Sequence, residues 1–172
     1  MDFGFLTKEE SNWTLLCYLL MDVGTNTLRR LFDKLLPPEN LREHLNRNAT
    51  KLKSLMMTKQ WNKLYPSRPS SLTSKTFDIT LLTVLFRTIP NMSTPATGWN
   101  SLPPDSDRSD EANIVRVKYY RNSVYANPSQ ISLDDATFNQ LWQKISRTLI
   151  ELGADATAVK ELEINGKPLT NG

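Results

Sequence analysis

One arginine stands at a position where a helix would present an apolar side chain. Ile114, Val117, Arg121 and Val124 follow one another at steps of three, four and three residues, which places all four on one side of a helix. A charge on such an apolar seam needs a partner. In a structural role its stem would pack while the guanidinium reaches water or pairs with a carboxylate; in a functional role the guanidinium would bind an anion.

Several common reaction types lack their residues in this chain. The single histidine is His44 and the single cysteine is Cys17, so a Ser-His-Asp site, a Cys-His site or a zinc site has little to be built from. Neither Gly-x-x-x-x-Gly-Lys-[Ser/Thr] nor Gly-x-Gly-x-x-Gly occurs. We therefore expect no cofactor and no metal.

Cys17 and the surrounding sequence bear on the compartment. The thiol cannot form an internal disulfide, and it lies in an apolar run that predicts a small buried hydrophobe, which fits a reducing environment. The uncharged stretch 11–21 is too short to cross a membrane, and acidic residues stand where a signal peptide would be basic. These features predict a cytoplasmic protein that does not associate with membranes.

The segment around Arg121 resembles the signature of HEPN domains. These helical modules carry, in their catalytic members, an arginine, a polar residue directly after it, and a histidine several positions on; here residues 119–127 read YYRNSVYAN. The chain is most similar to the subgroup that includes the HEPN-like domain of the DAZ-interacting, RNA-binding ubiquitin ligase and invertebrate multidomain proteins, several of which resemble innate immune sensors. The similarity covers most of the chain, in the order 24–25, 28–33, 37–38, 61, 64–66, 77–82, 98–100, 103, 106–107, 112–122, 138, 142 and 149–153.

The resemblance implies a reaction and also a departure from it. Catalytic HEPN proteins are metal-independent endoribonucleases in which two domains form one cleft; the histidine transfers protons and the arginine stabilises the phosphorane charge. By position, Arg121 takes the arginine role, Asn122 the polar role, and Asn127 the place of the histidine. An amide does not exchange a proton near neutral pH, and His44 could substitute only if folding brought it to the cleft.

The resemblance therefore implies a non-catalytic, HEPN-like interaction module that forms a homodimer, binds single-stranded RNA and serves a sensor or adaptor assembly. Two alternatives stay open. One is a working endoribonuclease that depends on Arg121, and the other is a purely protein-binding scaffold with partners among signalling or ubiquitin-pathway proteins.

A basic segment follows the first long helix. Between Arg42 and Lys75 there are eight basic side chains and one acidic one, Glu43, whereas the whole chain has a net charge of only +3. Residues four apart share a helix face, so a contact surface for RNA is predicted here, extended by the helix that carries Arg121. The predicted RNA contacts are Arg47, Lys51, Lys59, Lys63, Arg116, Lys118 and Tyr125. A basic surface that only keeps the protein soluble accounts for the same charges equally well.

The elements that must position these residues are helices. Six glycines against ten prolines, and apolar steps of three and four without strand-like alternation, predict an all-α antiparallel bundle of four to five main helices. The capping box Thr7-Lys8-Glu9-Glu10 begins one long helix with a joint near Gly24 and an end at Pro37. A second helical region breaks around 46–48 and continues to Tyr65, and a strongly apolar helix, capped by Ser74 or a neighbour, ends at Pro90.

The second half of the chain is predicted as a long crossover and two further helices. The crossover covers 90–107 and is anchored by Trp99 and Leu102. Ser109 caps the helix of Arg121, and a capping box at 132–135 begins the last main helix, which ends at Gly153. The predicted HEPN-like bundle covers 1–153, and 154–172 form a tail with at most a short helix.

Overall fold

The computed structural model describes residues 6–90, 92–126, 129 and 131–166. Every regular element among these residues is helical and no strand occurs in them, which confirms the predicted all-α bundle. Asn127 lies outside the described residues. The α-helices are α1 (Lys8–Tyr18), α2 (Gly24–Leu35), α3 (Pro38–Arg47), α4 (Ala49–Leu55), α5 (Thr58–Leu64), α6 (Ile79–Thr88), α7 (Asp110–Tyr125), α8 (Asp135–Glu151) and α9 (Ala156–Asn165).

The first two helices form one long rod with a joint in its middle. Thr7 caps α1 as predicted: its Oγ1 accepts from the backbone N–H of Glu10 at 3.1 Å and donates to the Glu10 carboxylate at 3.1 Å. The rod passes through a π-helical turn, Leu19–Val23, immediately before Gly24. A π turn holds an extra residue, so it shifts the apolar face around the helix, and this is the slip that the sequence predicted near Gly24.

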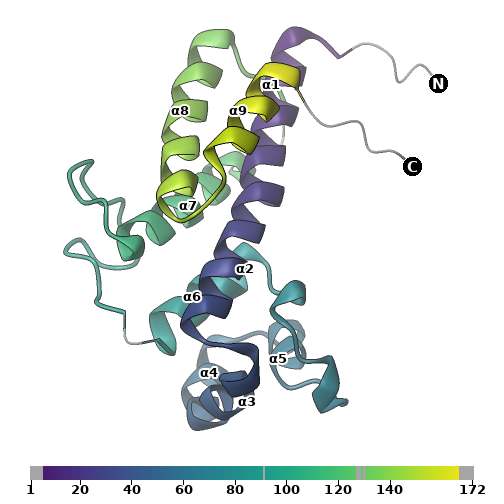
Figure 1. Cartoon of the computed structure of the whole chain (residues 1–172), viewed down its shortest axis with the longest axis vertical. Helices are drawn as coiled ribbons and strands as arrows, with labels where there is room; N and C mark the ends of the chain where they lie inside the picture. The colour runs from purple at the N-terminus through teal and green to yellow at the C-terminus, as the bar shows by residue number, and fades with distance from the viewer. Residues whose placement is uncertain (1–5, 91, 127–128, 130, 167–172) are drawn as a thin grey trace.

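The other helices pack around the two halves of this rod. In Figure 1, α1 lies with α7, α8 and α9 at one end of the molecule, and α2 lies with α3 to α6 at the other. One continuous core joins both ends, and α6, in contact with α2 and α7, is the helix at its centre, with six of its ten residues buried. Phe32 of α2 meets Phe77 and Phe86 edge to face, with ring centroids 5.7 Å apart in both pairs.

Two predicted caps are wrong. Asp78, not Ser74, caps α6 by accepting from the Leu81 N–H at 2.8 Å, because residues 74–76 form a separate 3₁₀ turn. Asp134, not Ser132, caps α8 by accepting from the Thr137 N–H at 2.7 Å. The preceding residue, Leu133, donates its N–H to the Glu9 carbonyl at 3.0 Å, which holds the segment before α8 extended along α1.

The crossover between α6 and α7 is long, as predicted. Trp99 anchors it against the core, and Pro95 and Pro103 are buried as well. Leu102 was expected to be a second anchor, but it stays 45% exposed. Ser109 caps α7 as predicted, by accepting from the Ala112 N–H at 3.2 Å.

The tail contains a helix that packs on the bundle. Gly153 ends α8 with a φ of +113°, a conformation that favours glycine, and α9 follows. Val159 and Leu162 of α9 join the core. A boundary between bundle and tail at residue 153 stays a prediction.

Candidate functional site

Arg121 lies at the edge of an open hollow between α2, α6 and the last turns of α7. The hollow is lined by Met21, Asp22, Thr25, Asn26, Arg29, Asp78, Ile79, Thr80, Arg121 and Tyr125. The guanidinium donates to Asn122 Oδ1 at 3.2 Å, and its central carbon lies 4.8 Å from the centre of the Tyr125 ring. Arg121 is half-buried rather than enclosed in the core, and no carboxylate of the described residues lies within 4.0 Å of it.

The chemistry of this hollow is that of anion and base recognition. Arg29 supplies a second guanidinium, which donates from Nε to the Phe77 carbonyl at 2.9 Å. Tyr125 is 57% exposed and offers a ring to a stacking partner. Of the two acids that line the hollow, Asp78 is occupied as the cap of α6, and Asp22 stays exposed.

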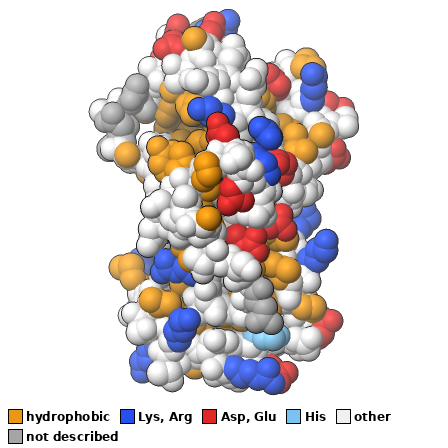
Figure 2. Space-filling view, turned by 90° about the vertical axis from the view of Figure 1, so that its left-hand side faces the viewer, with side chains coloured by type: hydrophobic (Ala, Val, Ile, Leu, Met, Phe, Trp, Pro, Cys, Tyr) orange, Lys and Arg blue, Asp and Glu red, His pale blue; other side chains and the backbone are white. Residues whose placement is uncertain are grey.

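His44 does not reach this hollow. It is half-buried on α3, in a different depression that it shares with the C-terminal end of α2 and the residues after α6. Figure 2 shows the chain's single histidine near the lower end of the molecule. Of the described residues that line the Arg121 hollow, none is a histidine, so no imidazole is placed there to transfer a proton.

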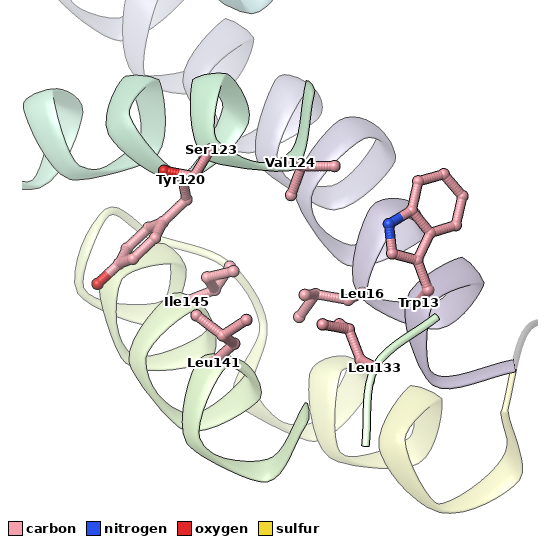
Figure 3. Close-up of a pocket in the computed structure, with 8 residues that line it drawn as sticks. All are labelled: Trp13, Leu16, Tyr120, Ser123, Val124, Leu133, Leu141 and Ile145. Atoms are coloured by element: carbon pink, nitrogen blue, oxygen red, sulfur yellow. The ribbon is translucent and has the colours of Figure 1, made fainter. Parts of the chain in front are cut away.

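The last turns of α7 face three different hollows. Arg121 and Tyr125 line the hollow described above. Lys118, Tyr119 and Asn122 face a groove along the crossover. The third is the pocket of Figure 3, in which Tyr120, Ser123 and Val124 lie opposite Trp13 and Leu16 of α1, Leu133, and Leu141 and Ile145 of α8. Arg121 and Asn122 are therefore hydrogen-bonded to each other and together form a ridge between two hollows, because successive helical side chains point about 100° apart.

Arg116 is buried, which corrects its prediction as an RNA contact. It is only 2% exposed, and it donates to Asn113 Oδ1 and to the Pro104 carbonyl, both at 2.7 Å. Burial, followed by the repulsion from Arg108, lowers its pKa. This side chain ties the crossover to α7. The pair Asn113 and Arg116, three residues apart on the inner side of the helix, is the sequence signal that could have indicated this role.

Lys118 is partly buried rather than spread on the surface. Burial, and then the neighbouring charge of Arg87, lowers its pKa. The two cations line a small depression together with Trp99. Lys118 thus belongs to the crossover side of α7 and not to the side of Arg121.

The predicted basic surface is present on α3 to α5. Arg47, Lys51 and Lys59 are exposed and Lys63 is half-buried. In Figure 2, the charged side chains toward the lower end of the face are mostly Lys and Arg. Among the described residues, an acidic partner is found for one of these four cations: Arg47 pairs with Glu43 at 2.5 Å.

The aromatic side chains beside this basic surface are used in packing. Trp61 and Tyr65 stack on each other with centroids 4.1 Å apart, and the Tyr65 hydroxyl donates to the Leu45 carbonyl. Trp61 and Tyr65 therefore contribute to the packing beneath the basic surface.

Comparison with known proteins places this geometry in a family. A model of the DZIP3/hRUL138-like HEPN family matches residues 38–170, a range that contains the basic surface, the crossover and α7. The chain belongs to this family. Over 157 residues it is 32% identical to the E3 ubiquitin-protein ligase DZIP3 of Homo sapiens and 31% identical to that of Mus musculus. No solved structure matches.

The alignments with these two relatives cover most of this HEPN chain and a small part of each relative. Each alignment takes in 85% of this chain and 13% of the relative's length. Within the described residues of this HEPN chain, no group of three or more metal-ligating side chains converges, and no helix combines the length and apolar character needed to cross a membrane.

Proposed function

We propose that this HEPN chain is a non-catalytic interaction module that binds single-stranded RNA. The observation that carries the proposal is the open hollow in which Arg121, stacked on Tyr125, lies unneutralised on the same lining as Arg29. Guanidinium groups bind phosphate through paired N–H donors, and an exposed tyrosine ring stacks on an unpaired base. The cations of α3 to α5 add a long-range attraction for the same polyanion.

A binding isotherm with a short oligouridylate, recorded at two salt concentrations, tests RNA binding. Binding should weaken steeply with salt, because each phosphate contact releases counterions. Arg121→Gln should weaken binding and lower the slope of log K against log salt by about one. Lys160→Gln removes the same charge from an exposed position on α9 and is the control. If the wild-type chain binds no RNA even at low salt, the protein-binding scaffold is the correct alternative.

The non-catalytic part rests on the absence of a proton-transfer group. Neither the lining of the Arg121 hollow nor position 127 of the sequence supplies a histidine. Single-stranded RNA incubated with the purified chain should therefore stay intact with and without a chelator. Cleavage that persists in the chelator and disappears in Arg121→Ala would establish the endoribonuclease instead.

The homodimer is a separate part of the proposal. An acidic stretch, Asp105, Asp107, Asp110 and Glu111, covers the end of the crossover and the start of α7, whereas the basic surface lies on α3 to α5. In a two-fold symmetric pair each acidic stretch can face the partner's basic surface. Light scattering should report a dimer that dissociates as salt is raised, and a monomer at high protein concentration would refute the pairing.

The setting of the module is proposed from its relatives' names. The matched proteins are E3 ubiquitin-protein ligases, so we place the chain in a sensor or adaptor assembly that includes ubiquitin-pathway proteins. A cytoplasmic setting is supported by Cys17, a free thiol whose pKa burial raises to about 11, which keeps it unreactive near neutral pH.

A further inference from the structure

A second groove lies on the other side of α7, where this helix meets the crossover. It has a volume of about 320 Å³, within the range of ligand sites. Trp99 and Asn100 of the crossover form one wall, and Lys118, Tyr119 and Asn122 of α7 form the other. Neither the family match nor the proposed role of Arg121 accounts for this groove.

The crossover wall is held in place before any ligand arrives. Gly98, with a φ of +79°, completes a tight turn in which its N–H donates to the Pro95 carbonyl at 2.8 Å. Trp99 packs against the core, and the Arg116 guanidinium holds the Pro104 carbonyl at 2.7 Å. A preformed wall loses little conformational entropy on binding, so contacts made there contribute fully to affinity.

The charge at the groove is positive and uncompensated. Lys118 is partly buried, and the neighbouring charge that lowers its pKa is another cation, Arg87, which lines a small depression with it. Within the described parts of the chain, neither side chain has an acidic partner within 4.0 Å. Two partly buried like charges disfavour each other, and an anion placed between them and solvent would relieve that repulsion.

The remaining groups suit a nucleobase. Tyr119 is 47% exposed although it belongs to a helix whose first half is buried, and the half-buried Trp99 lines the same groove. Asn100 and Asn122 are exposed, and each amide carries both donors and an acceptor, as the edge of an unpaired base requires. Aromatic faces, amides and a cation in one groove are the set used for single-stranded nucleic acid.

We propose that the groove between the crossover and α7 holds one nucleotide of single-stranded RNA, with the base at Tyr119 and Trp99 and the phosphate at Lys118. The proposal rests on the proposed RNA binding and assigns it a second contact site. The ridge formed by Arg121 and Asn122 separates this groove from the Arg121 hollow, so one strand crossing the end of α7 can contact both sites.

Binding of oligouridylate to paired variants tests the groove. Tyr119→Ala should raise Kd about tenfold through loss of one stacking contact, whereas Tyr119→Phe keeps the ring and should stay within about twofold of the wild type. Lys118→Gln should weaken binding and Lys118→Arg should restore it. Thermal unfolding of each variant shows that the fold is kept. Four-thiouridine in the oligonucleotide should cross-link to residues 99–102, or to Lys118, Tyr119 or Asn122.

The outcomes separate the two proposals. If the wild type binds no RNA, the proposed function fails and the groove assignment fails with it. If the wild type binds but Tyr119→Ala and Lys118→Gln bind equally well, and cross-links appear only on α3 to α5 or at the Arg121 hollow, RNA binding stands and the groove is refuted.

Discussion

The two halves of α7 differ sharply although they form one uninterrupted helix. Residues 112–117 are six consecutive buried residues, whereas residues 119–126 are half-buried or exposed and face three hollows. Each half carries an arginine. Arg116 is enclosed with two neutral acceptors at 2.7 Å, and Arg121 rests on an exposed tyrosine ring at an open hollow. The same residue type is thus enclosed by packing in one half and open to a hollow in the other.

The crossover contributes to this difference, together with the packing of α7 against α6 and α8. It lies over the first half of α7, where the Pro104 carbonyl accepts a hydrogen bond from the Arg116 guanidinium. At the end of the crossover, Arg108 donates to both carboxylate oxygens of Glu151 on α8. Beyond Lys118 the crossover provides only one wall of a groove. What covers a helical residue therefore decides its role more than its own type does.

Removing the buried arginine should give the largest effect. Arg116→Ala leaves Asn113 Oδ1 and the Pro104 carbonyl without their donor and opens a cavity, so we expect a loss of about 2–4 kcal/mol in the free energy of unfolding. Urea unfolding measures it, with the exposed Arg30→Ala as control. Equal stability of the two variants would show that the crossover holds without Arg116.

The ion pair of Arg108 and Glu151, at the end of the crossover, should contribute less to the free energy of unfolding, and its contribution should depend on pH. The Arg108 guanidinium lowers the pKa of Glu151, so the contribution is present above the ordinary carboxyl pKa of about 4.3 and is lost as pH falls through the lower folded value. We expect Glu151→Gln to lose about 1–2 kcal/mol at neutral pH and almost nothing in acid, since both side chains are less than a third exposed. A stability difference that does not change with pH would contradict the ion pair as its source.

Lys118 should show a small effect of the opposite sign. Burial and Arg87 lower its pKa, so the charged form is disfavoured in the folded state and the wild type gains stability as pH rises through that range. Lys118→Met should therefore be as stable as the wild type at neutral pH, or more stable by at most about 0.5 kcal/mol in the free energy of unfolding. This small advantage should shrink at alkaline pH, and a clear destabilisation at neutral pH would mean that the ammonium group has a structural partner.

Arg121 should matter least for stability. Because its guanidinium lies in an open hollow and bonds only to the side chain of the next residue, Arg121→Ala should change the free energy of unfolding by less than about 0.5 kcal/mol. The same urea series used for Arg116 measures it. A loss comparable to that of Arg116→Ala would remove the distinction between the two halves of α7.

Much of the helical framework was predictable because it depends on neighbours in the chain. Thr7 and Ser109 cap helices through side-chain oxygens that reach backbone N–H groups three residues on, and Gly153 adopts a φ that other residues disfavour. The caps at Asp78 and Asp134 were missed because nearby serines fit the same pattern, and choosing among them required the extended path of 132–133 along α1 and the separate turn at 74–76.

The candidate site was predictable only in part. The sequence indicated that Arg121 is unusual and that α3 to α5 carry basic side chains. In the structure Arg121 lines an open hollow, and the basic side chains of α3 to α5 are exposed or half-buried. Spacing along α7 could not show that Arg116 is enclosed, or that Arg121 and Asn122 open to different hollows. Those facts depend on the crossover and on α2 and α6, whose residues lie far from α7 in the sequence.

The sequence by itself determined that this protein is all-α, where its long helix is jointed, and that residue 127, where the resemblance to HEPN domains implies a histidine, is an asparagine. Hydrophobic periodicity and backbone sterics act over a few residues, so a single chain segment contains that information. Only the tertiary structure decided which cations are available to a ligand. Burial is set by surfaces brought together from distant parts of the chain, and these surfaces enclosed Arg116, half-covered Lys118 beside Arg87 and left Arg121 open.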